Sequence, residues 1–149
     1  MHGKGVNRSF PRSKKGSLAS RMAYYLMKEF LNNVDLAIDF HTGGSQRNNF
    51  PKIRYKPEDA RGFELIKVFN TPLIFNSKLI PKSFKNQCYK NNILVIVYEG
   101  GESLRLEENV TQLGINGKPR VLKSSIRMLI LLRALNQFIY IKENGYELQ

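Results

Sequence analysis

The sequence predicts an α/β fold, in which helices flank a sheet whose strands are largely parallel or mixed in direction. Two apolar runs, residues 34–40 and 93–98, have the length and β-branched composition of buried strands. Segments with helical spacing of apolar residues alternate with these runs, as is typical of this class. At 149 residues and 42% hydrophobic content, the chain is large enough to form one ordinary domain with a core.

The first third of the chain predicts a loop, a helix and a strand. Residues 1–16 contain glycines and a proline without apolar periodicity, so we expect a loop there. Ser17 is a suitable N-cap for a helix over residues 18–31. The apolar stripe of that helix consists of Leu18, Met22, Tyr25, Leu26 and Phe30. A buried strand over residues 34–40 follows, and the polar residues 42–56 predict a long loop.

The middle of the chain predicts a second helix and a second central strand. Pro57, followed by two acidic residues, is a favourable helix start because its missing N–H has no partner there in any case. A short strand is expected at residues 72–75, and residues 76–92 are expected to be irregular, with room for one helical turn. The β-branched run 93–98 is the clearest strand, and the glycine-rich residues 100–118 predict a loop.

The last part of the chain predicts a helix followed by strands. Residues 119–136 are apolar on most sides and predict a helix. Residues 138–142 alternate like a strand, and Asn144-Gly145 is a strong hairpin signal. The chain ends as the returning strand would begin, so we expect residues 137–149 to start a truncated β-rich region.

The charge of the chain indicates an anionic partner. The formal net charge is +12, and residues 1–21 carry six cations and no acidic residue. Such a surface suits nucleic acid or an anionic substrate, with an ordinary solvated surface as the plain alternative. Because the cations are not interleaved with stacking aromatic residues and no nucleic-acid motif is present, nucleic acid is not the favoured partner.

The cysteine content and the apolar runs favour a soluble protein. Cys88 is the single cysteine, which excludes an internal disulfide framework and fits a reducing compartment. The apolar runs are shorter than a bilayer span, and no signal-peptide core follows the basic N-terminus. We therefore expect a cytoplasmic protein without a membrane partner.

A histidine and a glutamate follow the two apolar strands. His41 precedes Thr42-Gly43-Gly44, and Glu99 precedes two further glycines. Because the carboxyl ends of parallel strands meet at one edge of a sheet, these side chains are candidates for a shared site. A neutral imidazole suits zinc, and a nearby carboxylate suits general-base catalysis. Taken singly, His41 could be a polar turn residue, and Glu99 could be a solvent-facing strand end.

Five segments that occur in this order resemble a known enzyme family. They are Asn-Arg-Ser-Phe-Pro at 7–11, Gly-Ser-Leu-Ala-Ser-Arg at 16–21, Ile-Asp-Phe-His-Thr-Gly-Gly at 38–44, Phe-Pro-Lys-Ile-Arg at 50–54 and Val-Tyr-Glu-Gly-Gly-Glu at 97–102. The series resembles the succinylglutamate desuccinylase/aspartoacylase family of zinc deacylases, which are relatives of the zinc carboxypeptidases. The resemblance covers roughly residues 5–135 and implies a zinc carboxypeptidase-like fold.

The resemblance also implies an activity and a set of roles. Members bind one zinc ion and hydrolyse N-acylated amino acids or similar small amides, giving a carboxylate and an amine. His41 matches a zinc ligand, and Glu99 matches the base that activates the zinc-bound water. Asn7 and Arg8 match substrate-binding residues, and Arg54 is a further candidate for the substrate site.

The sequence departs from the family at two points. The other zinc ligands of the family come from a His-x-x-Glu pair upstream of the Asn-Arg segment, whereas His2 is followed three positions later by Gly5. Relatives tend to carry an arginine ahead of the glutamate-bearing strand, where this chain has Lys85. Lysine keeps the charge but lacks the planar fork that grips a carboxylate.

These departures predict an incomplete enzyme. We expect residues 1–136 to be a partial zinc-deacylase catalytic domain that lacks parts at both ends and needs a complementary segment. One histidine ligand predicts weak zinc binding and little hydrolysis by the chain alone. Two alternatives remain: a non-catalytic relative that binds a small anionic ligand through Arg8 and Arg54, and a basic nucleic-acid-binding domain.

Overall fold

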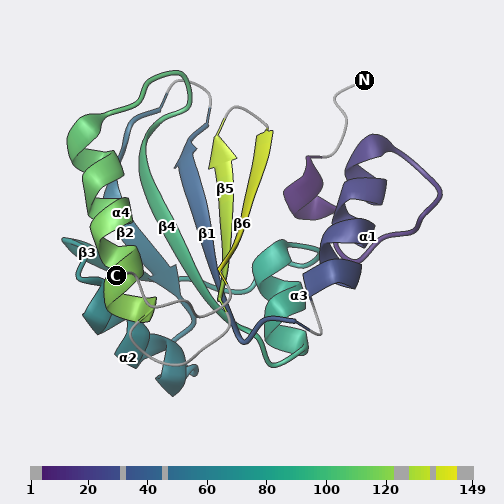
Figure 1. Ribbon diagram of the computed structural model, residues 1–149, viewed down its shortest axis with the longest axis horizontal. Coiled ribbons are helices and arrows are strands. Elements are labelled where there is room, and N and C mark those ends of the chain that lie inside the picture. The colour runs from purple at the N-terminus through teal and green to yellow at the C-terminus, as the bar shows by residue number, and fades with distance from the viewer. Residues whose placement is uncertain (1–4, 31–32, 45–46, 123–127, 135–136, 144–149) are drawn as a thin grey trace.

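The chain forms a six-stranded sheet with helices on both faces (Figure 1). The computed structural model describes residues 5–30, 33–44, 47–122, 128–134 and 137–143. The strands are β1 (Leu36–Gly43), β2 (Asn49–Tyr55), β3 (Leu73–Asn76), β4 (Leu94–Glu102), β5 (Met128–Ala134) and β6 (Gln137–Glu143). The helices are α1 (Leu18–Phe30), α2 (Ala60–Phe69), α3 (Phe84–Lys90), α4 (Glu108–Leu122) and the short 3₁₀ helix η1 (Val6–Arg8).

The sheet is mixed, with strand order β3-β2-β4-β1-β5-β6. The central strand β1 pairs in parallel with β4 on one side and with β5 on the other. Strand β2 runs antiparallel to β4 and parallel to β3, and β6 runs antiparallel to β5. The predicted α/β class, with a mixed sheet flanked by helices, is confirmed.

Two apolar layers cover the sheet, one on each face. Alternate residues of a strand point to opposite faces, so β1 and β4 each contribute to both layers. One layer packs against the η1, α1 and α3 side and includes Phe10, Ala23, Met27, Ala37, Phe84, Cys88, Val95 and Val97. The other packs against α2 and α4 and includes Leu36, Ile38, Ile53, Ile66, Phe69, Leu94, Ile96 and Tyr98.

In the part of the chain that the structure describes, helices α1, α2 and α3 begin at side-chain caps. The Ser17 hydroxyl accepts a hydrogen bond of 3.3 Å from the Ser20 N–H at the start of α1, as the sequence predicts. The Asp59 side chain accepts a hydrogen bond from the Gly62 N–H at the start of α2, and Ser83 accepts one from the Asn86 N–H at the start of α3. Helix α2 therefore begins after Asp59 rather than at Pro57. No helix in the described ranges is long and apolar enough to cross a membrane.

Three elements differ from the sequence-based expectations. Strand β2 occupies part of the expected loop 42–56, because it pairs with β3 and β4 and buries Pro51 and Ile53. Helix α4 begins in the expected loop 100–118. Strand β5 lies within the expected helix 119–136, since a continuous apolar run fits a parallel strand as well as a helix.

The carboxyl-terminal part of the described chain extends the same sheet. The predicted strand at 138–142 corresponds to β6, which pairs with β5 along its length. The hairpin signal at Asn144-Gly145 lies outside the described residues. The division between residues 136 and 137 into a catalytic domain and a β region stays a prediction.

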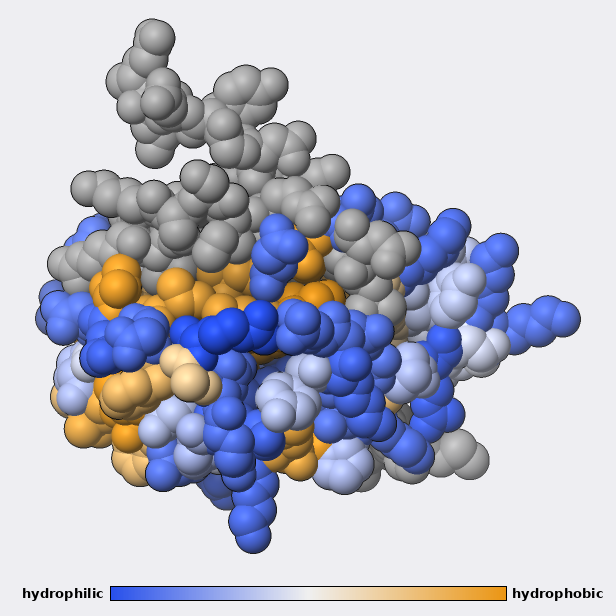
Figure 2. Space-filling view, turned by 90° about the horizontal axis from the view of Figure 1, so that it is seen from below, coloured by the Kyte–Doolittle hydropathy of each residue, from blue (hydrophilic) through white to orange (hydrophobic). Residues whose placement is uncertain are grey.

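Apolar side chains also reach the surface. Figure 2 shows a band of hydrophobic residues on the face seen from below, with hydrophilic residues along its lower side. Among the large exposed apolar residues are Leu73, Ile74 and Phe75 of β3, at the edge of the sheet.

Candidate active site

Strand β1 delivers Asp39 and His41 to one face of the sheet near its carboxyl end. The two residues are two positions apart and therefore share a face. His41 Nε2 lies 3.0 Å from Asp39 Oδ2, and the Asp39 side chain is only 1% exposed. This contact orients the imidazole through Nε2. The other ring nitrogen, Nδ1, is then the one that can bind a metal ion or form another hydrogen bond.

Glycines shape the turn that follows His41. The carbonyl of Arg47 lies where a Cβ at Gly43 would stand, so only glycine fits this position. Gly101, on the neighbouring strand, has a φ of +66°, which side chains rarely tolerate. The register of β1 and β4 shifts between His41 and Gly43. The two strands stay paired beyond the histidine, at Gly43 and Glu102, with an irregularity in between.

Strand β4 places Glu99 directly beside His41. The two residues are register partners in the parallel pairing of β1 and β4, so their side chains point to the same face. The Glu99 side chain is 11% exposed, and both of its oxygens are in contact with cations. The sequence-based expectation that position 41 and position 99 share one edge of the sheet therefore agrees with the register.

The cations beside Glu99 come from β2. Arg54 Nε lies 3.1 Å from Glu99 Oε1, and Lys52 Nζ lies 3.6 Å from Oε2. Ile53 between them is buried in the opposite layer, so the alternation of the strand directs Lys52 and Arg54 to the Glu99 face. Lys52 also donates a hydrogen bond of 3.2 Å to Asn49 Oδ1.

Lys85 of α3 forms a hydrogen bond to the backbone of β2. Its Nζ donates to the Arg54 carbonyl oxygen at 3.2 Å and to Ser77 Oγ at 3.0 Å. Burial, assisted by the positive charge of Arg54, lowers the pKa of Lys85 from 10.5 to about 8. The lysine therefore connects α3 with the strand that carries Arg54.

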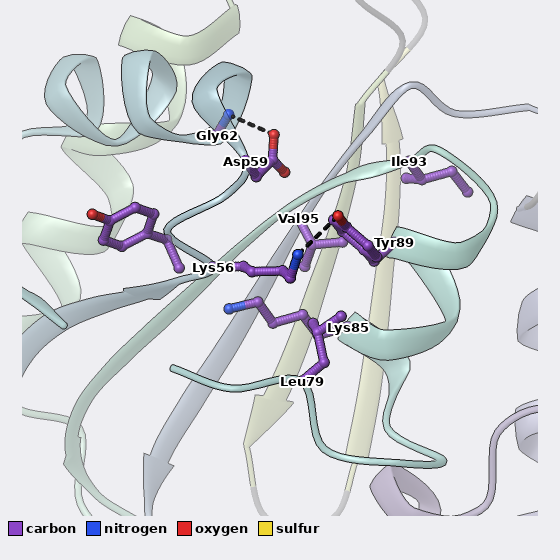
Figure 3. A pocket seen from close by; sticks show the side chains of 9 residues that line it. Lys56, Asp59, Gly62, Leu79, Lys85, Tyr89, Ile93 and Val95 are labelled. Atoms are coloured by element: carbon purple, nitrogen blue, oxygen red, sulfur yellow. Dashed lines mark hydrogen bonds between the residues drawn. The ribbon is translucent and has the colours of Figure 1, made fainter. Parts of the chain in front are cut away.

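A small pocket lies between α3 and the start of α2, and Lys85 is one of the residues that line it (Figure 3). Its lining residues are Tyr55, Lys56, Asp59, Gly62, Leu79, Lys85, Tyr89, Ile93 and Val95. Lys56 Nζ donates to the Tyr89 hydroxyl at 2.9 Å and lies 3.3 Å from a carboxylate oxygen of Glu58. These partners satisfy the Lys56 ammonium within the fold.

Asn7 and Arg8 lie in η1, at the start of α3. The Asn7 Oδ1 accepts a hydrogen bond of 3.0 Å from the Phe84 N–H. Arg8 is exposed, and its guanidinium donates to the Asn7 carbonyl oxygen at 2.8 Å. Among the described residues, no hydrogen bond or ion pair joins either residue to His41 or Glu99. The link is indirect, since Phe84 precedes Lys85, which holds the Arg54 backbone.

Two residues of this constellation had no assigned role in the sequence analysis. Asp39 is the one acidic residue of β1 and stands two positions before His41, a spacing that could have indicated a partner for the imidazole. Lys52 lay in a segment expected to be a loop. Its relation to Glu99 depends on the antiparallel register of β2 and β4.

The residues at this edge of the sheet provide one ligand for a metal ion rather than a complete set of ligands. His41 presents an imidazole whose other nitrogen is held by a carboxylate, as is usual for a metal-binding histidine. Within the described ranges, no group of three histidine, cysteine, aspartate or glutamate side chains is placed to hold a metal ion. A full ligand set would need residues outside these ranges.

The fold is a mixed α/β sheet flanked by helices, with an imidazole and a carboxylate on neighbouring strands. The family model of the succinylglutamate desuccinylase/aspartoacylase catalytic domain matches residues 2–125. The chain therefore belongs to the succinylglutamate desuccinylase/aspartoacylase family, which confirms the resemblance of its motifs. No curated protein matches the chain significantly.

Solved structures of the same family share this fold. A succinylglutamate desuccinylase/aspartoacylase from Rhodobacter sphaeroides has 21% identity and a TM-score of 0.74, over 89% of this chain and 46% of its own. The product-bound ectoine utilization protein EutE (DoeB) from Ruegeria pomeroyi has 23% identity and a TM-score of 0.74, over 86% and 44%. A succinylglutamate desuccinylase from Silicibacter sp. TM1040 has 19% identity and a TM-score of 0.73, over 88% and 44%. The chain thus spans less than half the length of these proteins.

Proposed function

We propose that this chain carries part of the active site of a zinc-dependent deacylase, which hydrolyses the amide bond of a small N-acylated amino acid or related amine. The observation that carries the proposal is the register pairing of His41 with Glu99 on adjacent parallel strands. This pairing brings a metal-type imidazole and a buried carboxylate to one edge of the sheet. Membership of the family supports the class of reaction.

In this proposal, His41 is a metal ligand and Glu99 is the general base. Asp39 holds His41 Nε2, so the ring is fixed with Nδ1 available to a metal. A zinc ion, when bound, would polarise the substrate carbonyl and make a bound water molecule more acidic. Glu99 takes a proton from the attacking water and returns it to the leaving amine, so the products are a carboxylate and an amine.

The substrate-binding residues in the proposal are Arg54, Asn7 and Arg8. The Arg54 side chain is 43% exposed and contacts Glu99 through Nε alone, so its guanidinium is accessible to a carboxylate of the substrate. Arg8 is exposed beside Asn7 and suits an anionic group at the surface of the site. An N-acylated amino acid has at least one such carboxylate.

The remaining metal ligands are assigned to residues outside the described ranges or to a complementary polypeptide. The resemblance implies a His-x-x-Glu pair for this role. With His41 as the single described ligand, we expect the chain alone to bind zinc more weakly than the micromolar range. Calorimetric titration with zinc measures this, and micromolar or tighter binding by the chain alone would contradict the expectation.

The experiment that tests the function measures release of amine from a panel of N-acyl amino acids in the presence of zinc. The chain is combined with a polypeptide that carries the His-x-x-Glu segment of a family member. Turnover should be abolished by Glu99→Gln and by His41→Ala. The control is Glu102→Gln, because Glu102 lies on the same strand but pairs with the exposed Arg105. Persistent turnover in both site variants would refute the roles.

A second candidate is a non-catalytic relative that binds a small anion. It is favoured by the excess of positive charge around Glu99, where Lys52 and Arg54 contact the carboxylate and Lys85 lies next to Arg54. Binding of succinate without turnover in the complemented preparation would support this candidate. The nucleic-acid alternative stays a prediction, and salt-dependent retention of short oligonucleotides measures it.

A further inference from the structure

The two cations that contact Glu99 are not equivalent. The Lys52 side chain is 16% exposed, whereas that of Arg54 is 43% exposed. Lys52 is the antiparallel register partner of Glu99. The Lys52 ammonium also donates a hydrogen bond to Asn49 Oδ1. Arg54 reaches Glu99 from two residues further along β2 and through a single nitrogen.

We propose that Lys52 is the positioning residue of the Glu99 carboxylate, while Arg54 is an exchangeable partner that can turn to a ligand. The proposal deepens the proposed function and rests on it in so far as Glu99 is the base. Lys52 keeps the carboxylate beside His41 when Arg54 leaves. Arg54 is then able to engage an anionic group without leaving the carboxylate unneutralised.

The electrostatics of a nearly buried carboxylate require such a fixed partner. Removing one member of a buried ion pair leaves an uncompensated charge, which is strongly unfavourable. If Arg54 were the only counterion of Glu99, the carboxylate would follow the guanidinium or lose its neutralisation on ligand binding. Lys52, with a compact ammonium that bridges Asn49 and Glu99, prevents both outcomes.

The position of Glu99 can be followed without any turnover. The full chain is labelled with ¹³C at the carboxyl carbon of glutamate, and the Glu99 resonance is assigned by its loss in Glu99→Gln. In Lys52→Met, we expect this resonance to shift by more than its own linewidth and to broaden. Lys52→Arg should restore the wild-type signal, because a cation is retained at the same register position.

Two further variants provide the matched controls. Lys56→Met removes a lysine of the same segment that pairs with Glu58, and it should leave the Glu99 signal unchanged. Arg54→Met should leave a sharp Glu99 resonance, because Lys52 still holds the carboxylate. Asn49→Ala, which frees the Lys52 ammonium without removing it, should broaden the Glu99 signal, and it supplies the same test if Lys52→Met does not fold.

The proposal is overturned if the Glu99 resonance keeps its position and width in Lys52→Met, or in Asn49→Ala where that variant replaces it. It is also overturned if Arg54→Met disturbs Glu99 more than Lys52→Met does, since the roles would then be reversed. Failure of the proposed function would appear separately, as absence of Glu99-dependent amine release. The two failures are therefore distinguishable.

Discussion

Replacement of Lys85 by methionine should change the way in which the stability of the protein depends on pH. The pKa of Lys85 is lowered from 10.5 in the unfolded chain to about 8 in the fold, because burial and the charge of Arg54 disfavour the ammonium. Between these two values, the unfolded chain holds more protons than the folded chain. The free energy of unfolding therefore rises as the pH increases from about 8 to 10.5.

The size of this effect follows from the shift. Each pKa unit corresponds to about 1.4 kcal/mol, which gives an upper limit of about 3 kcal/mol over the interval. Because Lys85 is only partly buried, solvent screening reduces the expected gain to about 1–2 kcal/mol. The gain is absent in Lys85→Met, so the stability of the wild type relative to the variant should increase by this amount from pH 8 to pH 10.5.

Urea unfolding of both proteins at several pH values in this interval measures the difference. Ionisation of tyrosines occurs in both proteins and cancels in the comparison. Lys67→Met is the matched control, because the Lys67 side chain is half exposed and pairs with Glu64 at the surface. A stability difference between wild type and Lys85→Met that stays constant or falls with pH would refute the reasoning.

Three further substitutions should have defined effects in the same unfolding assay. Tyr98→Phe removes the hydrogen bond to the Val110 carbonyl oxygen and should cost about 1 kcal/mol. Burial raises the pKa of Tyr98 from 10.0 to about 12, so this tyrosine makes the wild type lose stability as the pH rises from 10.0 to about 12. Tyr98→Phe should lose that contribution in urea unfolding over this higher interval, and an unchanged fall in stability would argue against it. Asp39→Ala removes the partner of His41 and should cost about 2–3 kcal/mol, whereas a neutral effect would show that the pair is dispensable. Ile96→Ala, at a fully buried position of β4, should cost about 2–5 kcal/mol, and a smaller loss than that of Tyr98→Phe would contradict its place in the core.

The central part of the fold could be predicted from local sequence because its signals are local. The apolar runs of β1 and β4 have no competing interpretation as loops, and the glycines after each run mark their ends. Once both strands were placed in a parallel arrangement, His41 and Glu99 were expected at one edge. Their exact register pairing agrees with that expectation.

The elements that the sequence did not predict depend on contacts between distant segments. Strand β2 begins with asparagine and contains Pro51, which suggest a loop, and it becomes a strand by pairing with both β3 and β4. The contact of Lys52 with Glu99 requires the register shift between Asn49 and Lys52, which no local pattern shows. The apolar run that forms β5 has no helix-specific period, so its pairing with β1 decides its structure.

The most direct measurement of the central claim is cross-linking of positions 41 and 99. Register partners on adjacent strands lie about 5 Å apart between Cα atoms, within the range of about 4.4–6.8 Å that a disulfide spans. In a Cys88→Ala background, His41→Cys combined with Glu99→Cys should form a disulfide under mild oxidation, as read by mass spectrometry. His41→Cys combined with Val97→Cys, two positions out of register, should remain reduced. Two free thiols at positions 41 and 99 in a folded protein would contradict the account.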